Sequence, residues 1–174
     1  MCSVTGTVYF LSYYWRSSSS TMIKIFNRDG VEIFCYQPES GDDLDPVELS
    51  GADLEKANLE GRELSEANLE GANLCGSNLY WTILFRANLE NADLSNSSMC
   101  GVDLKEANLK RAKLINADLG PTNLGGASQL QGADMRGADL TGAILRSAEY
   151  DERTQFPSGF DPDSSGMIFV RDNT

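Results

Sequence analysis

A five-residue period runs through most of this 174-residue chain and restricts its fold more than any other feature. From Leu49 to Leu124 every fifth residue is leucine, with Met99 the one exception. After a single step of six, the spacing of five resumes at Leu130 and continues to Tyr150. Leucine occupies 18 of these 21 positions, and the residue two places earlier is Ala, Ser, Thr or Val in 20 of them. One repeating structure must therefore account for residues 49–150.

A period of five fits neither of the two ordinary secondary structures. On an α-helix, residues five apart advance by about 140° per repeat and give no single apolar stripe. On a flat strand, successive leucines would point to opposite faces. The pattern works if the chain turns in every repeat, so that the leucine and the small residue point inward. Asn or Asp precedes 13 of the 21 central residues. Asn, Asp and Gly tolerate the tight backbone corners that such turning requires.

The phrases "ANLEG", "ADLSN" and "ADLTG" resemble the consensus A-(D/N)-L-x-x of the pentapeptide-repeat family, and the resemblance covers residues 46–150. It implies an all-β fold, a right-handed quadrilateral β-helix with four pentapeptides per coil and therefore about five coils. Short proteins of this type are common in cyanobacteria. We expect no cofactor.

Four pentapeptides per coil place residues 20 apart above one another. One predicted interior ladder is Leu59, Leu79, Met99, Leu119 and Leu140, whose last step is 21 because of the extra residue. We expect that extra residue to form a bulged corner within residues 124–130. Because an aspartate in a dry ladder would be an unpaired buried charge, Leu79→Asp is predicted to unfold the neighbouring coils.

A β-helix has open ends that need caps. Residues 22–45 are predicted to be a β-hairpin with a connector, and residues 1–21 a linker or a disordered segment. After the repeats at 46–150, residues 151–174 are expected to cap the other end, with Phe156 and Phe160 packed on the last coil. Residues Asp161, Asp163, Ser165 and Asp172 have the spacing of a calcium-binding loop. Because Pro162 interrupts it and no helices flank it, we interpret this segment as a turn and predict no metal site.

Composition excludes several functions. The formal net charge is −12 and histidine is absent, which disfavours direct contact with nucleic acid or an anionic membrane surface. No apolar run approaches the roughly 18 residues of a membrane span. The four cysteines form no Cys-x-x-Cys pair, so we expect free thiols and a cytoplasmic location. With no nucleophile motif, phosphate loop or metal cluster, the chain is predicted not to be an enzyme.

The segment 78–86, "NLYWTILFR", departs from the pattern because apolar residues fill outward positions. Tyr80, Trp81, Ile83 and Phe85 are the candidate partner-binding residues, since exposed aromatic patches mark interfaces. The favoured alternative is that the N-terminal hairpin folds over them.

Two functions remain open at this stage. The first is a rigid module that binds an unidentified partner protein and regulates or scaffolds it. The second follows from the resemblance, because some pentapeptide-repeat proteins mimic duplex DNA and bind DNA gyrase. An end-to-end dimer is one expected form of assembly.

Overall fold

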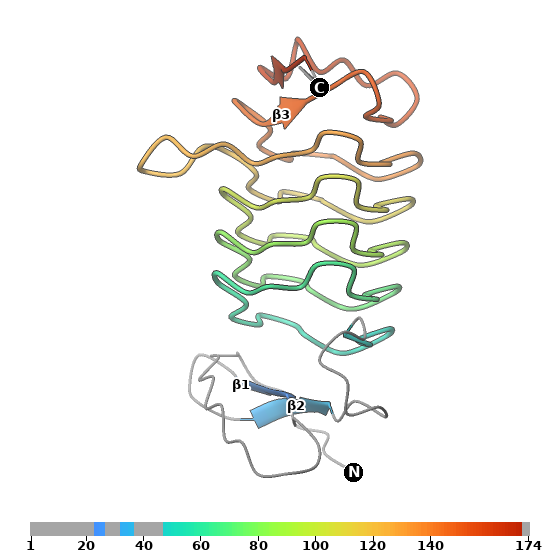
Figure 1. Cartoon of the computed structure of the whole chain (residues 1–174). Helices are drawn as coiled ribbons and strands as arrows, with labels where there is room; N and C mark the ends of the chain where they lie inside the picture. The colour runs from blue at the N-terminus through green and yellow to red at the C-terminus, as the bar shows by residue number, and fades with distance from the viewer. Residues whose placement is uncertain (1–22, 27–31, 37–46, 172–174) are drawn as a thin grey trace.

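The backbone of the repeats pairs in parallel between residues 20 positions apart. The computed structural model describes residues 23–26, 32–36 and 47–171. Glu48 pairs with Asn68, and equivalent bridges repeat upward to form four ladders, which begin at Glu48, Asp53, Asn58 and Glu63. They are named here the first to fourth ladders, in that order. Figure 1 shows the resulting stack of coils, which is a β-helix.

The interior of the stack contains the repeated leucines and small residues, as the period predicts. Leu59, Leu79 and Leu84 have no exposed surface, and neither has Ala67. From Leu49 to Leu119, each central residue also donates its backbone N–H to the next coil, as Leu59 does to the Asn78 carbonyl at 2.7 Å. Hydrogen bonds thus join the coils while the leucines fill the space between them, so backbone and core depend on the same register.

The Asn and Asp preference has a cause at each corner. The backbone N–H of Tyr80 donates to Asn78 Oδ1 at 3.1 Å, which closes the turn after the central leucine. Asn78 Nδ2 meanwhile donates to Asn58 Oδ1 at 3.1 Å, one coil below. Two residues after every repeated leucine except Leu119 and Leu124, the backbone adopts a left-handed conformation, with φ of 64° at Gly61 and 56° at Trp81. Such a corner favours glycine and small polar residues.

The predicted one-residue bulge is wrong, because the chain leaves the coil for longer. Asp103 pairs with Gln129, and Asp118 with Ile144, so both steps span 26 residues instead of 20. The six extra residues amount to one pentapeptide plus one residue. They lie in a loop at residues 120–127, which projects from the stack (Figure 1). Leu124, predicted as a central residue, is 90% exposed on this loop.

Pro121 explains why the coil opens there. It occupies the corner position that is left-handed in the coils below, whereas the proline ring holds φ near −65°. The same position donates a backbone hydrogen bond in those coils, as Gly61 does to the Tyr80 carbonyl at 2.8 Å. Proline has no N–H to donate, so the regular corner fails on both counts.

The predicted core ladder needs one correction that follows from this loop. Leu119 donates its N–H to the Ile144 carbonyl at 2.9 Å, so Leu145 is the residue stacked above it. Leu140 instead belongs to the second ladder, above Leu114, because Asp139 pairs with Lys113. Leu145 is buried and Leu140 only half-buried.

The two N-terminal strands lie at the end of the stack, as Figure 1 shows. Strand β1 (Ile23–Phe26) pairs antiparallel with β2 (Glu32–Tyr36). Ile25 is 1% exposed and belongs to the same hydrophobic core as the leucines. The interpretation that this hairpin covers the Trp81 patch is wrong for both strands, because they pack at the open end of the core. The predicted linker at 1–21 lies outside the described residues.

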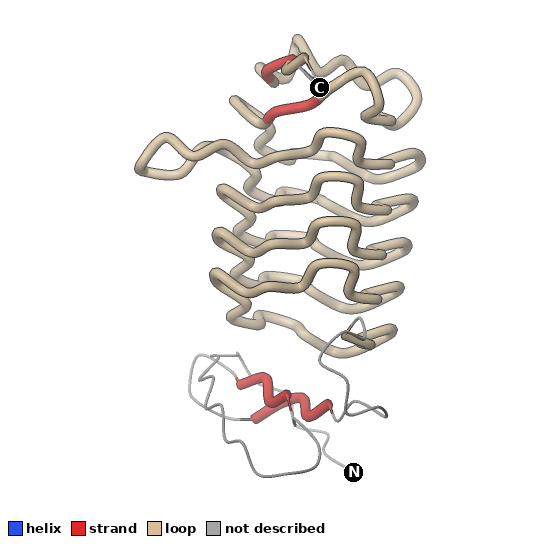
Figure 2. The backbone as a smooth tube through the Cα atoms, in the orientation of Figure 1, coloured by secondary structure: helices blue, strands red, loops and turns tan. Residues whose placement is uncertain are grey.

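The C-terminal segment continues the ladders before it leaves them. Strand β3 (Glu149–Tyr150) pairs in parallel with β4 (Ile168–Phe169), and both are marked in Figure 2. Between them, Gln155 accepts the Met135 N–H at 2.7 Å, which puts Phe156 in a leucine position. Phe156 stacks on Phe160 with ring centroids 5.1 Å apart, and both pack against the core. The described residues contain no helix with the length and hydrophobicity of a membrane span.

Candidate interaction surface

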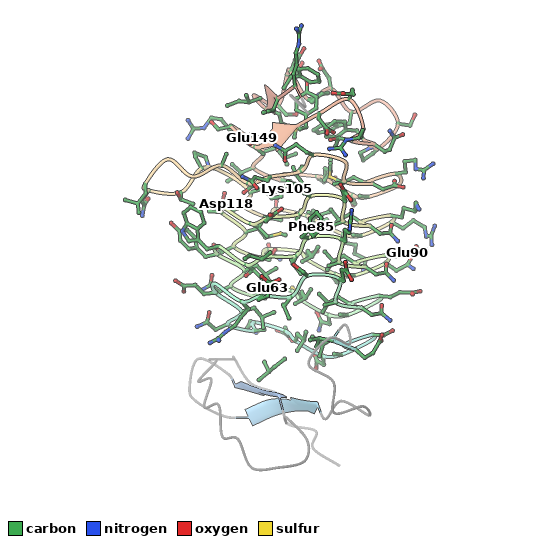
Figure 3. All side chains as sticks on the ribbon, viewed as in Figure 1. Glu63, Phe85, Glu90, Lys105, Asp118 and Glu149 are labelled. Atoms are coloured by element: carbon green, nitrogen blue, oxygen red, sulfur yellow. The ribbon has the colours of Figure 1, made fainter. Side chains whose placement is uncertain are left out.

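The four predicted partner-binding residues lie on two neighbouring faces that meet at one edge of the stack. Tyr80 and Trp81 follow the third ladder, whereas Ile83 belongs to the fourth ladder and Phe85 follows it. Trp81 is 44% exposed and Ile83 37%, while the two other side chains are half-buried. Tyr80 meets Trp81 edge to face at 6.1 Å, and Arg86 lies over the Phe85 ring at 4.7 Å. Phe85 is labelled in Figure 3.

Trp81 packs against the projecting loop. The corner one coil above it is Gly101, where a β-carbon would lie 3.2 Å from the Trp81 ring. At Gly126, on the returning side of the loop, a β-carbon would lie 2.9 Å from Trp81 Cζ2 and closer still to Cη2. Two glycines therefore make room for one indole, which supports the base of the loop. The edge containing Trp81, Gly101 and residues 120–127 is called the loop edge below.

The loop is closed by its own hydrogen bonds. Thr122 donates its N–H to the Gly126 carbonyl at 2.8 Å and accepts at its own carbonyl from Gly125 at 2.9 Å. The Gly126 N–H donates to Thr122 Oγ1, also at 2.8 Å. Ser128 then restores the interior path, since its hydroxyl donates to the Met99 carbonyl at 3.1 Å. These hydrogen bonds restrict the conformations open to the loop.

Two exposed apolar residues at this edge are absent from the sequence-based candidates. Leu124 forms the loop tip, and Ile144, which is 49% exposed, pairs with Asp118 at the loop's base. Pro121 was the available signal, because a proline at a left-handed corner predicts that the chain must leave the coil. Trp81, Ile83, Leu124 and Ile144 thus expose apolar surface at the loop edge or on the two faces beside it, at different levels of the stack.

The charged residues are unevenly distributed around the stack. On the two faces beside the loop edge, five exposed or half-buried carboxylates accompany three cations, Arg62, Lys105 and Arg146; the carboxylates are Glu60, Glu63, Asp103, Asp118 and Glu149. Lys105 is paired with Asp103 at 3.2 Å. Asp118 and Glu149 are labelled in Figure 3. These faces are therefore acidic.

The opposite edge, between the first and second ladders, has a cluster of four cations among eight carboxylates; the cations are Lys110, Arg111, Lys113 and Arg136, and the carboxylates are Glu48, Asp53, Glu55, Glu70, Glu90, Asp93, Asp134 and Asp139. Lys110 pairs with Asp134 at 3.2 Å, and Lys113 pairs with Asp93 at 3.2 Å. Hydrogen bonds from Arg136, with further support from Lys110, hold the pKa of Asp134 well below its usual range. These cations are thus engaged by carboxylates of neighbouring coils, which supports the interpretation of a solvated structural face.

Neither the cysteines nor the aspartates near the C-terminus form a reactive or metal-binding site in the described residues. Cys75 and Cys100 are free thiols. Burial, together with the nearby Asp118, raises the pKa of Cys100 to about 11. Asp161 accepts the Asp163 N–H at 3.1 Å, and Asp163 accepts the Tyr150 hydroxyl, so both carboxylates serve the turn. No metal-binding cluster occurs in residues 47–171, and Asp172 lies outside the described residues.

Comparison with known proteins places this fold in a family. A family model described as pentapeptide repeats (8 copies) matches three segments of the chain, residues 43–80, 82–120 and 122–149. The stack is thus a right-handed β-helix of repeated pentapeptides. This chain belongs to the pentapeptide-repeat family. No curated protein sequence matches it significantly.

Several solved structures of the same family resemble the chain. The pentapeptide-repeat protein Rfr23 from the cyanobacterium Cyanothece 51142 is 32% identical, with a TM-score of 0.53 over 59% of this chain and 65% of its own. Nostoc alr5209 is 28% identical, with a TM-score of 0.41 over 71% of this chain and 84% of its own. Nostoc HetL, which is involved in the regulation of heterocyst differentiation, is 32% identical, with a TM-score of 0.35 over 74% of this chain and 62% of its own. This chain spans less than two thirds of Rfr23 and of HetL.

Proposed function

We propose that this chain is a non-enzymatic, rigid protein-interaction module that binds a partner protein through the loop edge and its two flanking faces. One observation carries the proposal. Trp81 and Ile83, with Leu124 and Ile144, expose apolar surface at one edge of a coil stack whose other outward positions are mainly polar. Contiguous exposed apolar groups mark binding surfaces, and tryptophan is the residue most enriched among strong interface contacts.

The architecture supports a scaffold or regulatory role. Each coil is hydrogen-bonded to the next, so side chains on one face keep their spacing along the stack. The hairpin and the C-terminal segment are proposed to cap a stack of about five coils, and an end-to-end dimer remains compatible with this shape. A cytoplasmic location is proposed because free thiols at Cys75 and Cys100 suit a reducing compartment.

Affinity capture from the source organism's lysate tests the proposal. The bait is the wild-type chain, compared with Ile83→Glu, which adds charge to the exposed patch, and with Asn91→Asp. Asn91 is exposed at the opposite edge, where its Oδ1 accepts from Arg111 at 3.0 Å, a role that aspartate keeps. A protein retained by wild type and Asn91→Asp but lost by Ile83→Glu is the expected result. Absence of any specifically retained protein would refute the interaction function.

Gyrase binding as a DNA mimic is the alternative. The excess of carboxylates on the outer faces of the stack favours it, since a mimic of duplex DNA must present negative charge to its partner. A supercoiling assay with purified DNA gyrase separates the two functions. Inhibition or protection at micromolar concentration of this protein would establish the mimic, and no effect would remove it.

A further inference from the structure

We propose that the loop at residues 120–127 is the anchor of the interaction, and that its partner is a protein with an apolar pocket rimmed by basic side chains. The proposal rests on the function proposed above and specifies its site and partner class. Leu124 would enter the pocket, while the carboxylates on the two flanking faces would meet the basic rim.

The shape of the loop requires a concave partner. Leu124 lies at the tip with 90% of its surface exposed, on a segment that projects from the stack (Figure 1). The β-helix does not need this leucine, because Leu119 already connects to the next coil at Ile144. A projecting apolar side chain can bury its whole surface only by insertion into a pocket, and such anchors carry much of an interface's free energy.

The loop is prepared to bind without first being ordered. Three hydrogen bonds between Thr122 and the two glycines at 125 and 126 close it. Trp81 packs against Gly126 and Gly101 at its base. Holding a binding loop in its bound shape lowers the entropic cost of association. Trp81 is therefore assigned as a positioning residue for Leu124, in addition to the surface that it exposes itself.

The surrounding charges identify the rim of the partner. Five carboxylates and three cations occupy the faces that flank the loop, and one of those cations, Lys105, is paired with Asp103. Carboxylates therefore exceed cations around the loop, as they also do at the opposite edge. A partner surface around the pocket must then carry positive charge for its potential to complement this edge. An acidic or neutral rim would leave the carboxylates unpaired.

The test uses the protein captured by the wild-type chain, purified and titrated against four baits by calorimetry. These are wild type, Leu124→Asp, Trp81→Ala and the opposite-edge control Asn91→Asp. Leu124→Asp is expected to weaken binding at least about tenfold, because it puts a carboxylate into an apolar pocket. Its melting temperature should equal that of wild type, since Leu124 has little packing to lose. Affinity of wild type should fall as sodium chloride is raised from low to high concentration.

The outcomes distinguish a failure of this inference from a failure of the proposed interaction function. Equal affinity of Leu124→Asp and wild type would overturn the loop as anchor but leave the interaction function standing. If the affinity does not change with salt concentration, the proposal that basic side chains surround the partner's pocket is wrong. Self-association of wild type in sedimentation velocity that Leu124→Asp abolishes would make a second copy the occupant and overturn the proposed partner. If wild type captures no protein at all, both the function and this inference fail.

Discussion

Asn78 illustrates how single residues in this chain serve two neighbouring structures at once. Its Oδ1 accepts the backbone N–H of Tyr80 within its own corner, and its Nδ2 donates to Asn58 in the coil below. Leucines do the same in the interior, where each contacts residues from the coils above and below. A substitution should therefore be energetically coupled to the residue stacked on it in the same ladder, and not to the equivalent residue of the next pentapeptide along the chain.

At the residue scale, the corrected register predicts which leucines are energetically coupled. Leu119→Ala and Leu145→Ala should each cost about 2–5 kcal/mol of unfolding free energy, as for other buried leucines. Because the two residues stack, their double variant should deviate from additivity by roughly 0.5–3 kcal/mol. Urea unfolding measures all four proteins of the cycle. In the matched double-mutant cycle of Leu119 and Leu140, the effects of the two substitutions should add within about 0.5 kcal/mol. Coupling between these two residues would instead support the predicted ladder, in which Leu140 lies above Leu119.

At the element scale, the loop and the N-terminal hairpin are additions that the repeat does not specify. The loop is inserted where Pro121 cannot form a left-handed corner, and it is held by an indole from a coil further down the stack. The hairpin contributes Ile25 to the core at the open end. Both elements depend on contacts with distant parts of the chain, so each can be tested without altering the repeats.

Gly126→Ala should displace the loop from Trp81. The added methyl group would overlap the indole, and such overpacking typically costs about 1–3 kcal/mol. We expect faster hydrogen exchange at the amides of residues 125 and 126. We also expect the Trp81 side chain to become more exposed to solvent, as measured by its fluorescence. The double variant Gly126→Ala/Trp81→Ala should recover part of the lost free energy, since the clash is then absent. Slow exchange in the single variant would mean that Trp81 does not hold the loop.

Ile25→Ser should destabilise the β-helix from its N-terminal end. Ile25 is 1% exposed and lies in the common core. The unfolding free energy should therefore fall by nearly the transfer free energy of a buried aliphatic side chain, roughly 1.5–3 kcal/mol. Ile168→Ser is the control, as Ile168 is 48% exposed near the other end and should change stability little. Thermal or urea unfolding followed by circular dichroism provides the measurement. Equal stability of Ile25→Ser and wild type would exclude the hairpin as a cap.

At the scale of the whole molecule, the coils are linked by carboxylates as well as by backbone. Arg86 pairs with Glu106 at 2.7 Å, and Arg153 bridges Glu106 at 3.5 Å and Asp151 at 2.7 Å, which joins three levels of the stack. Burial acts to raise the pKa of Asp151, but hydrogen bonds from Arg153, Gly132 and Thr154 outweigh it and lower the pKa. The pKa of Asp134 is lowered mainly by hydrogen bonds from Arg136.

These depressed carboxyl pKa values predict loss of stability in acid. An unfolded aspartate titrates near pH 3.9, so the unfolded chain binds more protons than the folded chain below about pH 5. The melting temperature should stay nearly constant above about pH 5 and fall as the pH drops through the lower, folded-state pKa values. Asp134→Asn should flatten this acid dependence. A melting temperature that rises between pH 5 and pH 3 would contradict the assignment.

Much of this protein is determined by local sequence. The five-residue period alone excludes a helix and a flat strand, and it assigns the leucines and alanines to the interior because only a chain that turns in every repeat buries both. The Asn and Asp residues before the leucines suffice to close the corners. These features lie within single pentapeptides. Asn or Asp precedes 13 of the 21 central residues, so the repeat can be recognised without knowing which coils stack on each other.

Only the tertiary structure decided the features that depend on stacking between coils. Leu124 has the spacing of a core residue, yet the stack omits it because Pro121 prevents the corner and the next coil accepts Leu130 instead. That six-residue shift replaces Leu140 with Leu145 above Leu119. Trp81 is an outward residue in its repeat, but its contact with Gly126 exists only because the coil two levels up opens at the same edge. Such contacts follow from long-range register, which a five-residue period does not contain.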